Sequence, residues 1–534
     1  MKKIILFVMI IVFILSNSKT YSQDSLHLVA TFVGTSSDPL VPDILTRNPY
    51  EINLGDINND GMSDFVIHSN SGRYFSICKG DSPWNGNRIK IQTPEGFPQG
   101  YSNVTGIGDI NGDGYDDFAI AGSKDYLYYI GMVDIFLGGD SIDLIPDFSF
   151  TRHYTIWDFL SFGSSGDFNN DGYQDFLIRN HYIREQEKGE AYLFKGGNIL
   201  SNHPYKTFKG NSNVGFFSEN SIFCDINGDN FDDILITESF LPYGIIPPIP
   251  KLYIFYGGNE IKDSADVVID LGMAPQIFDL HDVNNDGYED FMLMTSSGYP
   301  KLFLGSSNFD PNSFIQFSNY DLIMSFGYGI GYLGDINNDG FDDFGINIEN
   351  YKNSKGEMVG KLNIYLGGKE IDTIPDFSLM GETHWSDYGE FLGALGDING
   401  DGYNEFFVCA TSYPNRNEMA GKIYIYSMKK FIVGVEESND NIPIEYLLSQ
   451  NYPNPFNPTT TIEFSIPDVG TGLALSELKV YDMLGREVAT LVNEQKSPGN
   501  YEVKFDGSNL ASGVYFYQLR AGEFSQTKKL ILIK

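Results

Sequence analysis

Short apolar runs recur along most of the chain, separated by polar segments that are rich in glycine and aspartate. Runs such as Phe65–Ile67 and Phe118–Ile120 follow a polar loop, and an aromatic-aliphatic run ending in Gly-Gly comes later, as in Leu362–Gly368. A further short run follows, as in Ile374–Leu379. Runs of this length, bounded by turn residues, are typical of β-strands. The pattern therefore predicts four strands in each unit, with the polar loop joining the first strand to the second.

The polar loop occurs seven times, and its clearest copy lies within Gly334–Phe344. The spacings between successive copies are 53, 58, 58, 57, 53 and 62 residues. A near-constant period with one supersecondary unit per repeat indicates a repeat architecture. Four strands in each of seven units predict an all-β fold, a seven-bladed β-propeller. The seven copies begin at Asp56, Asp109, Asp167, Asp225, Asp282, Asp335 and Asp397.

Each loop places oxygen atoms at alternate positions. Side-chain oxygens stand at the first, third, fifth and ninth positions, and a backbone carbonyl stands at the seventh. Ca²⁺ takes six to eight oxygen ligands, and glycine at the sixth position allows the sharp turn. We therefore expect up to seven Ca²⁺ ions, with these ligands besides the seven initial aspartates: Asn58, Asp60, Met62, Asp64, Asn111, Asp113, Tyr115, Asp117, Asn169, Asp171, Tyr173, Asp175, Asn227, Asp229, Phe231, Asp233, Asn284, Asp286, Tyr288, Asp290, Asn337, Asp339, Phe341, Asp343, Asn399, Asp401, Tyr403 and Glu405.

The loop is not an EF-hand, because its twelfth position in the sixth copy is Ile346, within a predicted strand, instead of a bidentate glutamate. Asp and Asn also cap turns without a metal. Turn capping explains one or two loops, but seven loops with converging carboxylates need a cation. Two copies depart from the pattern. Asn230 replaces the glycine of the fourth copy and tolerates positive φ, and Glu405 replaces the last aspartate of the seventh.

These repeats resemble the FG-GAP (VCBS-like) repeats of integrin-α-type propellers over residues 26 to 435. Phe162-Gly163 and Phe326-Gly327 precede their loops as they do in that family. The resemblance implies a calcium-binding adhesion protein that binds its ligand on the face away from the calcium loops.

Alternating strand direction places all seven loops on one face and the remaining connections on the other. Trp157 and Trp385, two of the three tryptophans, fall in those other connections. Binding residues tend to lie in loops on a rigid scaffold, so we expect a glycan or protein ligand on that face. The alternative is that these aromatic residues pack between blades. The connections concerned are 152–159, 181–190, 238–250, 349–360, 381–388 and 411–421.

The N-terminus reads as a signal peptide, residues 1–22, with a basic start followed by the apolar run Ile4–Leu15. We expect cleavage after Ser22, with Ser18 as the alternative. The run is too short to span a bilayer, and no later segment is long enough. The propeller is expected over residues 23–435. Its last blade takes its outer strand from His27–Phe32, which we favour, or from Phe431–Val435.

After a short linker, 436–442, the period disappears, and residues 443–534 form a small β-rich domain for which we expect an Ig-like sandwich. Its opening Tyr452-Pro-Asn-Pro-Phe-Asn-Pro458, its Tyr481–Arg486 and Gly513–Tyr517 motifs and its lysine-rich apolar end resemble the C-terminal sorting domain of the type IX secretion system of Bacteroidetes-like bacteria. The resemblance implies the type IX secretion machinery as a partner and export to the medium or the outer cell surface. The alternative is an ordinary Ig-like module at the end of an adhesin.

The formal net charge of −36 excludes nucleic acid and anionic lipid as partners through bulk charge. Seven Ca²⁺ ions would reduce it to −22. The three cysteines (Cys78, Cys224, Cys409) lie far apart without ligand spacing, and we expect buried thiols. The seven histidines form no H-x-x-x-H pair, and we interpret His281, beside the fifth loop, as structural. No nucleophile elbow or phosphate loop occurs.

The sequence therefore predicts a secreted or surface-displayed calcium-binding propeller that acts as a monomeric binding module and not as an enzyme. The alternative is an exported polysaccharide lyase or hydrolase on the same scaffold, because propellers also support catalysis. A structural coat component is the third hypothesis.

Overall fold

A computed structural model of the full chain divides into two compact units, residues 1–434 and 435–534. The predicted signal peptide and linker lie outside the described residues. The structure describes residues 26–33, 52–68, 74–82, 84, 86, 88–92, 103–125, 130–140, 142, 145–153, 159–181, 189–210, 215–240, 249–272, 275–295, 299–318, 329–414, 421–429, 447–448, 451, 454, 456–466, 474–483, 486–496, 499–521 and 524–533.

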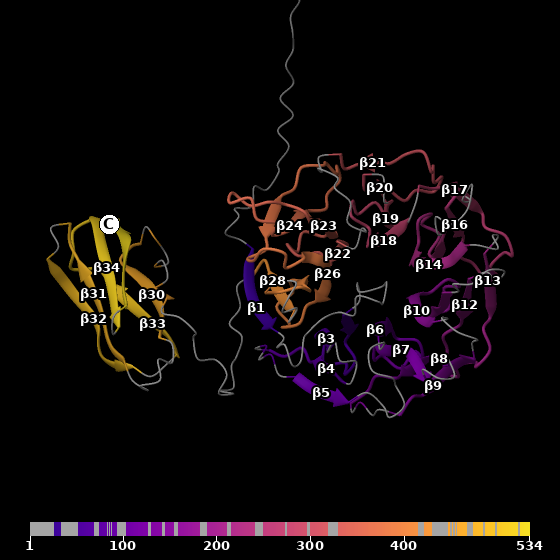
Figure 1. Ribbon diagram of the computed structural model, residues 1–534, viewed down its shortest axis with the longest axis horizontal. Helices are drawn as coiled ribbons and strands as arrows, with labels where there is room; N and C mark the ends of the chain where they lie inside the picture. The colour runs from indigo at the N-terminus through magenta and orange to yellow at the C-terminus, as the bar shows by residue number, and fades with distance from the viewer. Residues whose placement is uncertain are drawn as a thin grey trace, which may run out of the picture. The chain divides into compact units, whose positions relative to one another are not determined.

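The first unit is built of seven four-stranded antiparallel sheets, which Figure 1 shows around a central opening. We number these sheets as blades one to seven by the polar loop that each contains. Blades one to three are β2 (Asn53–Gly55), β3 (Asp64–His68), β4 (Tyr74–Cys78) and β5 (Arg88–Gln92); β6 (Asn103–Gly108), β7 (Asp117–Asp125), β8 (Ile130–Phe136) and β9 (Phe148–His153); and β10 (Phe159–Gly166), β11 (Asp175–His181), β12 (Glu190–Phe194) and β13 (Lys206–Lys209).

The next three blades repeat the same order, with each strand paired to the one before it in the chain. The all-β prediction is confirmed by these sheets. Blades four to six are β14 (Gly215–Cys224), β15 (Asp233–Phe240), β16 (Lys251–Phe255) and β17 (Val267–Asp270); β18 (Gln276–His281), β19 (Asp290–Met294), β20 (Lys301–Phe303) and β21 (Ile315–Gln316); and β22 (Ile330–Gly334), β23 (Asp343–Ile348), β24 (Lys361–Tyr365) and β25 (Phe377–Met380).

Blade seven combines the two ends of the first unit. It contains β26 (Tyr388–Gly396), β27 (Glu405–Ala410) and β28 (Lys422–Ser427), and its outer strand is β1 (His27–Val33). β1 is antiparallel to β28, with His27 opposite Ser427 and Val33 opposite Lys422. The favoured N-terminal outer strand is therefore confirmed. The alternative strand, 431–435, lies outside the described residues.

The polar loops connect each blade to the next. The backbone N–H of Asp116 in blade two donates to the carbonyl oxygen of Asp56 in blade one at 3.1 Å. The equivalent bond between the last and first blades runs from Ser63 N–H to the Asp397 carbonyl at 3.0 Å. Because backbone groups form these bonds, the connection is independent of side-chain identity. The loop face thus continues from blade seven to blade one.

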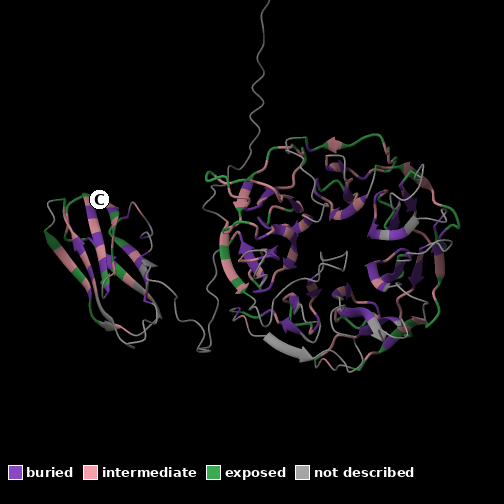
Figure 2. Cartoon of the chain, in the orientation of Figure 1, coloured by how far each residue is buried: buried purple, intermediate pink, exposed green. Residues whose placement is uncertain are grey.

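The buried residues lie mainly on the strands, and exposed residues are more frequent toward the outer edge, as Figure 2 shows. One hydrophobic cluster includes Phe65 of blade one, Phe118 of blade two and Ile425 of blade seven. Neighbouring blades therefore share their cores. The predicted burial of the cysteines is confirmed: Cys78, Cys224 and Cys409 are buried free thiols.

A glycine before the loop allows neighbouring blades to approach closely. Gly334 has φ of +82°, and a Cβ atom there would lie 2.6 Å from Nδ2 of Asn404 in the next blade. We expect Gly334→Ala to lower the free energy of unfolding by about 1–3 kcal/mol, measured by urea denaturation in saturating calcium. Gly356→Ala is the control, because Gly356 has φ of +80° but open space around it. Equal losses in the two variants would contradict a cost from the close approach.

The second unit consists of two sheets whose buried side chains form one core. The alternating pattern of the sequence predicts strands at Thr461–Ile466, Ser476–Tyr481, Tyr501–Phe505 and Gly513–Leu519, and all four occur, but it does not predict β32 (Glu487–Lys496). The opening motif belongs to the domain: Phe456 is 2% exposed and its N–H donates to the Ile531 carbonyl. The sheets are β29 (Leu447–Leu448), β30 (Thr459–Ile466) and β33 (Gly499–Asp506); and β32 (Glu487–Lys496), β31 (Ala474–Tyr481), β34 (Gly513–Ala521) and β35 (Phe524–Leu532).

Candidate metal loops and the opposite face

The first aspartate of every polar loop organises the loop backbone. In the sixth loop, Asp335 Oδ1 accepts the N–H of Asp339 at 3.0 Å and Oδ2 accepts the N–H of Gly340 at 2.7 Å. The other six loops have the same pair of hydrogen bonds. These bonds hold the backbone of every copy in the same turn. The predicted repetition of a single loop geometry is thus visible in all seven copies.

The last acidic residue of every loop is buried. None of the seven side chains has exposed surface. Each residue lies at the start of the second strand of its blade, which pairs with the first and third strands. In the sixth loop, Asp343 accepts the N–H of Gly367 at 2.7 Å and the N–H of Ile336 at 3.0 Å. The first of these partners begins the Gly-Gly segment after the third strand, so the carboxylate joins three parts of one blade. The seven residues are Asp64, Asp117, Asp175, Asp233, Asp290, Asp343 and Glu405.

Burial without a cation perturbs these carboxyl groups strongly. It raises the pKa of Asp64 and Asp117 to about 7 and that of Asp175 and Glu405 to about 8. Hydrogen bonds from backbone N–H groups oppose the shift, and neighbouring loop carboxylates add to it. A buried carboxylate is costly unless a positive charge accompanies it. A divalent cation in the loop would provide that charge.

The amide at the third position tests whether the loop suits calcium. In the sixth loop, the amide oxygen and nitrogen of Asn337 are both buried, and neither has a hydrogen-bond partner among the described residues. In the third loop, Asn169 instead directs its Nδ2 toward Oδ2 of Asp175 at 3.1 Å. An oxygen donor set of carboxylates, an amide and a carbonyl matches the preference of Ca²⁺. The residues present therefore fit the ion.

The two divergent loops keep the shared backbone. Asn230 has φ of +65°, so asparagine adopts the conformation in which the other loops use glycine, as predicted. Glu405 is buried like the aspartates, but its surroundings differ. Its Oε2 accepts the N–H of Ile398 at 3.2 Å, and its buried Oε1 has no hydrogen-bond partner among the described residues. Within the part of the chain that the structure describes, the seventh loop therefore lacks the glycine N–H that binds the last aspartate in the other six blades.

Metal-free protein is expected to lose stability as the pH rises. Burial raises the pKa of all seven loop carboxyl groups in the folded state, to about 7 or 8 in the six other than Asp343, whereas their ordinary values when unfolded are near 4. The folded state therefore binds more protons between these values, so stability is greatest at the acidic end and falls as pH passes the folded pKa. We expect the melting temperature of calcium-depleted protein to fall between about pH 5 and about pH 8. Calcium should abolish this slope, because it binds the ionised form, and a flat profile in depleted protein would contradict the explanation.

A single buried aspartate can be tested by an isosteric change. Asp343→Asn removes one charge from the sixth loop, so we expect one fewer bound Ca²⁺ and a loss of about 1–3 kcal/mol in calcium, measured by urea denaturation. In chelator the loss should shrink toward zero, because the burial of the wild-type carboxyl already favours its protonated form. Asp376→Asn is the control, since Asp376 accepts the Leu366 N–H outside any loop. The same loss with and without calcium would argue against a metal at Asp343.

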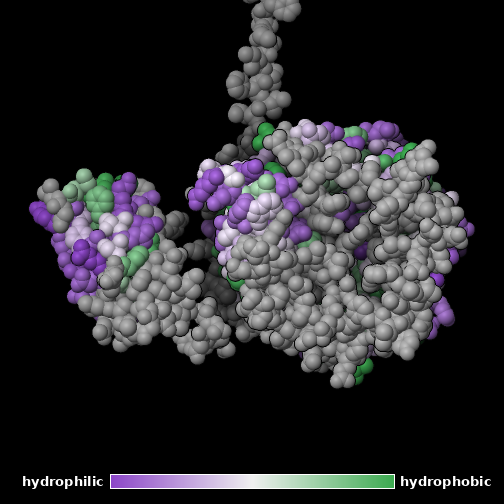
Figure 3. All heavy atoms as spheres, viewed as in Figure 1, coloured by the Kyte–Doolittle hydropathy of each residue, from purple (hydrophilic) through white to green (hydrophobic). Residues whose placement is uncertain are grey.

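The connections at the other ends of the strands lie on the face opposite the loops. Of the two predicted tryptophans, Trp157 lies outside the described residues. Trp385 is half-buried with φ of +60°, and its backbone N–H donates to the Met358 carbonyl at 2.8 Å. This bond joins connection 381–388 to connection 349–360. The visible outer edge of the described surface is mainly hydrophilic, with scattered hydrophobic residues (Figure 3).

A cavity of about 400 Å³ lies among the first strands of the seven blades. Its lining includes Ser164, Asp279, His281 and Tyr332, so this part of the wall is polar. Asp279 and His281 were not among the predicted site residues, because they precede the fifth loop and stand outside its alternate positions.

Comparisons with known proteins connect both units to described families. Residues 450–534 match the family model for a secretion system C-terminal sorting domain. Integrin alpha-5 of Xenopus laevis is 28% identical over 212 residues, which cover 36% of this chain and 19% of that protein. Integrin alpha-V of Gallus gallus is 29% identical over 165 residues, covering 28% and 15%. Integrin alpha-3 of Mus musculus is 33% identical over 96 residues, covering 18% and 8%.

The aligned part thus spans less than a fifth of the length of these relatives. A solved structure, described as the crystal structure of BBS1N in complex with ARL6DN, soaked with lead, has a TM-score of 0.40 and 9% identity over 77% of this chain and 99% of that one. This likeness is too slight to support an argument.

The fold and the matched segments define an exported all-β repeat protein. Its C-terminal segment is a secretion system sorting domain, and its repeats are related to those of integrin α chains. The sorting domain directs the chain to the cell surface or the medium. Within the described residues, no helix has the length and apolar character needed to cross a bilayer. Neither the sorting domain nor the integrin α chains belong to a catalytic family.

Proposed function

We propose that the first unit is a seven-bladed propeller that holds up to seven Ca²⁺ ions and acts as a binding module for a glycan or a protein. The observation that carries the proposal is the sevenfold loop with its buried carboxylate. In each loop the first aspartate fixes the backbone, and the last acidic residue has no exposed surface. Seven buried carboxylates in loops of this kind are best stabilised by bound cations, and their oxygen atoms suit Ca²⁺.

The ligand would bind on the face opposite the loops. Support comes from connections 349–360 and 381–388, which are joined by the Trp385–Met358 hydrogen bond. The exposed His384 stands beside Trp385, with ring centroids 5.2 Å apart. The positive φ of Trp385 costs free energy, and strained backbone conformations of this kind are frequent at functional sites. A half-buried indole beside an exposed imidazole suits stacking on a sugar ring or packing against a peptide.

The domain organisation belongs to the same proposal. Residues 1–22 would direct secretion, residues 23–435 would form the monomeric binding module, and residues 443–534, after the linker 436–442, would engage the type IX secretion machinery. The division of the structure near residue 434 supports the boundary between the module and the linker. No residue constellation described above favours the alternative of a polysaccharide lyase or hydrolase.

A binding screen tests the proposal. Residues 23–435 would be applied to a polysaccharide and glycan array, and to surface-protein extracts, in calcium and then in chelator. We expect a defined ligand, with binding lost in Trp385→Ala. Phe314→Ala is the matched control, because it removes an exposed aromatic side chain from the β20–β21 connection on the loop face. Equal ligand binding by the two variants would show that the ligand site does not include Trp385. The absence of any bound ligand in both screens would contradict a binding role.

A further inference from the structure

The residue immediately before the first loop aspartate distinguishes two neighbouring blades from the other five. Five copies have glycine there, and blades four and five have Cys224 and His281. The structure explains why glycine stands at this position, because a residue of the next blade occupies the space that a side chain would need. A Cβ atom at Gly55 would lie 2.1 Å from Asp116 Oδ2. Two adjacent blades therefore replace the smallest residue with side chains that can bind metals. The five glycines are Gly55, Gly108, Gly166, Gly334 and Gly396.

His281 occupies a backbone conformation that other blades give to glycine. It has φ of +55° at the bulge of β18, where the corresponding glycines of blades one, two, six and seven have φ of +68° to +82°. A bulge of this kind favours glycine. Glycine is the residue found there in the sister blades, so it is compatible with the fold at His281 as well.

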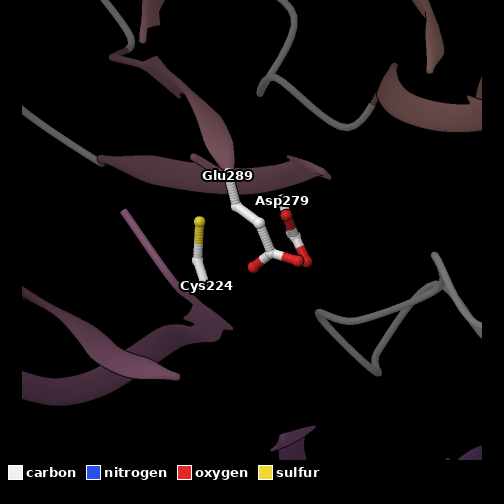
Figure 4. Close-up of side chains that lie close together, drawn as sticks. All are labelled: Cys224, Asp279 and Glu289. Atoms are coloured by element: carbon white, nitrogen blue, oxygen red, sulfur yellow. The ribbon is translucent and has the colours of Figure 1, made fainter. Parts of the chain in front are cut away.

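Cys224 and His281 meet two carboxylates at the boundary between blades four and five. Sγ of Cys224 and a carboxylate oxygen from each of Asp279 and Glu289 lie within 4.8 Å of one another. Figure 4 shows the three side chains close together. The Nδ1 atom of His281 lies 3.5 Å from Glu289 Oε1 and 3.8 Å from Asp279 Oδ2. Glu289 also accepts the N–H of Asp225 in blade four at 2.8 Å, which fixes its position.

The distances suit a small tetrahedral ion. At a tetrahedral zinc ion with ligand distances of about 2.0–2.3 Å, neighbouring ligand atoms are about 3.3–3.8 Å apart. The two His281 distances already lie in this range. The Cys224 sulfur and the two carboxylate oxygens, which lie within 4.8 Å of one another, would contract around the ion, and the imidazole, which is not part of that group, would move toward the sulfur. Cys224 is fully buried, whereas Asp279 and His281 line the central cavity. The cavity provides a route by which an ion reaches the cluster.

The donor set also differs from that of the seven loops. The loops offer only oxygen, which suits Ca²⁺, whereas a thiolate and an imidazole favour zinc and related transition ions. Among the described residues, His281 is the only base that forms an ion pair with Asp279 or Glu289. Tyr332, whose ring packs edge-on to His281 at 4.3 Å, and Asp342 complete the surroundings of the imidazole. Together with Asp342, the cluster brings three carboxyl groups and a thiol around one imidazole, so a divalent cation would offset part of its negative charge.

We propose that Cys224, Asp279, His281 and Glu289 form a binding site for one divalent transition metal ion of the zinc type, which joins blades four and five at the wall of the central cavity. Binding forms metal–sulfur, metal–nitrogen and metal–oxygen bonds, and the protons of the Cys224 thiol and of the ion-paired His281 imidazolium pass to solvent. The ion changes no oxidation state and needs no co-reactant.

The test uses the full secreted chain with its loops saturated by calcium, and Co²⁺ as the probe. A thiolate bound to Co²⁺ gives a charge-transfer absorption that oxygen-only sites lack. We expect one equivalent of Co²⁺ with this absorption, displaced by Zn²⁺, and equilibrium dialysis should give the same stoichiometry. Cys224→Ser should abolish the absorption, and Cys409→Ser, which removes a buried thiol in blade seven, should leave it unchanged.

His281→Gly keeps the test valid if Cys224→Ser fails to fold. Glycine is the residue of the sister blades and removes the backbone strain, although the variant also loses the ion pairs of His281 with Asp279 and Glu289. Circular dichroism and a thermal melt of the metal-free variant therefore establish that it is folded before its Co²⁺ affinity is measured. We expect its affinity for Co²⁺ to fall at least about tenfold, since one ligand is lost. Absence of the charge-transfer band in the wild type, or unchanged affinity in either Cys224→Ser or His281→Gly, would overturn the site.

Discussion

Removal of calcium is expected to lower the melting temperature of the first unit by more than about 10 °C. Extracellular calcium modules have dissociation constants of about 10⁻⁴ to 10⁻³ M, so about 10 mM calcium stabilises each site by roughly 1–3 kcal/mol. Seven such loops together contribute on the order of 10 kcal/mol. The chelated protein also has to keep seven buried acidic side chains without their cation, which favours unfolding.

The measurement is a thermal scan followed by near-ultraviolet circular dichroism, in calcium and after depletion. The C-terminal unit serves as an internal control, because the seven loops all lie in the first unit, so its own transition should not move. Return of calcium should restore the high transition, and magnesium should restore it poorly, since it demands a stricter octahedral geometry. An unchanged melt after depletion would refute structural calcium.

Deletion of β1, residues 26–33, is expected to destabilise the first unit about as severely. β1 is the outer strand of blade seven, and its loss leaves β28 as an unpaired edge. The strand also reaches blade one: the ring of Phe32 lies 6.3 Å from Phe65 and 6.3 Å from Trp84, both buried. The deletion therefore removes backbone pairing and packing at the one place where the two ends of the unit meet.

We expect the deleted protein to show no cooperative melt or to melt more than about 10 °C lower. A synthetic peptide of the strand, added in trans, should restore part of the loss because it can pair with β28. Two point variants separate packing from pairing. Phe32→Ala should cost about 2–4 kcal/mol, whereas Leu28→Ala, at a side chain that is 50% exposed, should cost much less. A deletion with the stability of the full-length protein would show that the strand is dispensable for closing the unit.

The repeated local chemistry was readable from the sequence because it depends on neighbours in the chain. The first aspartate caps N–H groups four and five residues later, so the spacing of Asp335, Asp339 and Gly340 predicts the loop directly. The same locality explains why the strands on either side and the positive φ of Asn230 were predicted. The opening motif of the C-terminal domain was recognisable for a similar reason, since its residues are contiguous.

Contacts between distant residues were harder to read. The outer strand of blade seven had two candidates in the sequence, and only the pairing of β1 with β28 decided between them. The strand β32 was missed because six of its ten residues are polar and its apolar residues, Val488, Ala489, Leu491 and Val492, do not alternate regularly along the strand. Loss of periodic apolar positions removes the evidence on which strand prediction depends.

The sequence by itself determined the repeat, the loop geometry and the acidic residues that we assign to calcium, because each rests on interactions within about ten residues. The tertiary structure decided what lies beside each loop. Cys224 and His281 are 57 positions apart and were interpreted separately as a buried thiol and a structural histidine. They lie beside two carboxylates only because blades four and five are neighbours. Side chains one repeat apart come together through the packing of sheets, and the spacing of residues within one repeat does not predict this.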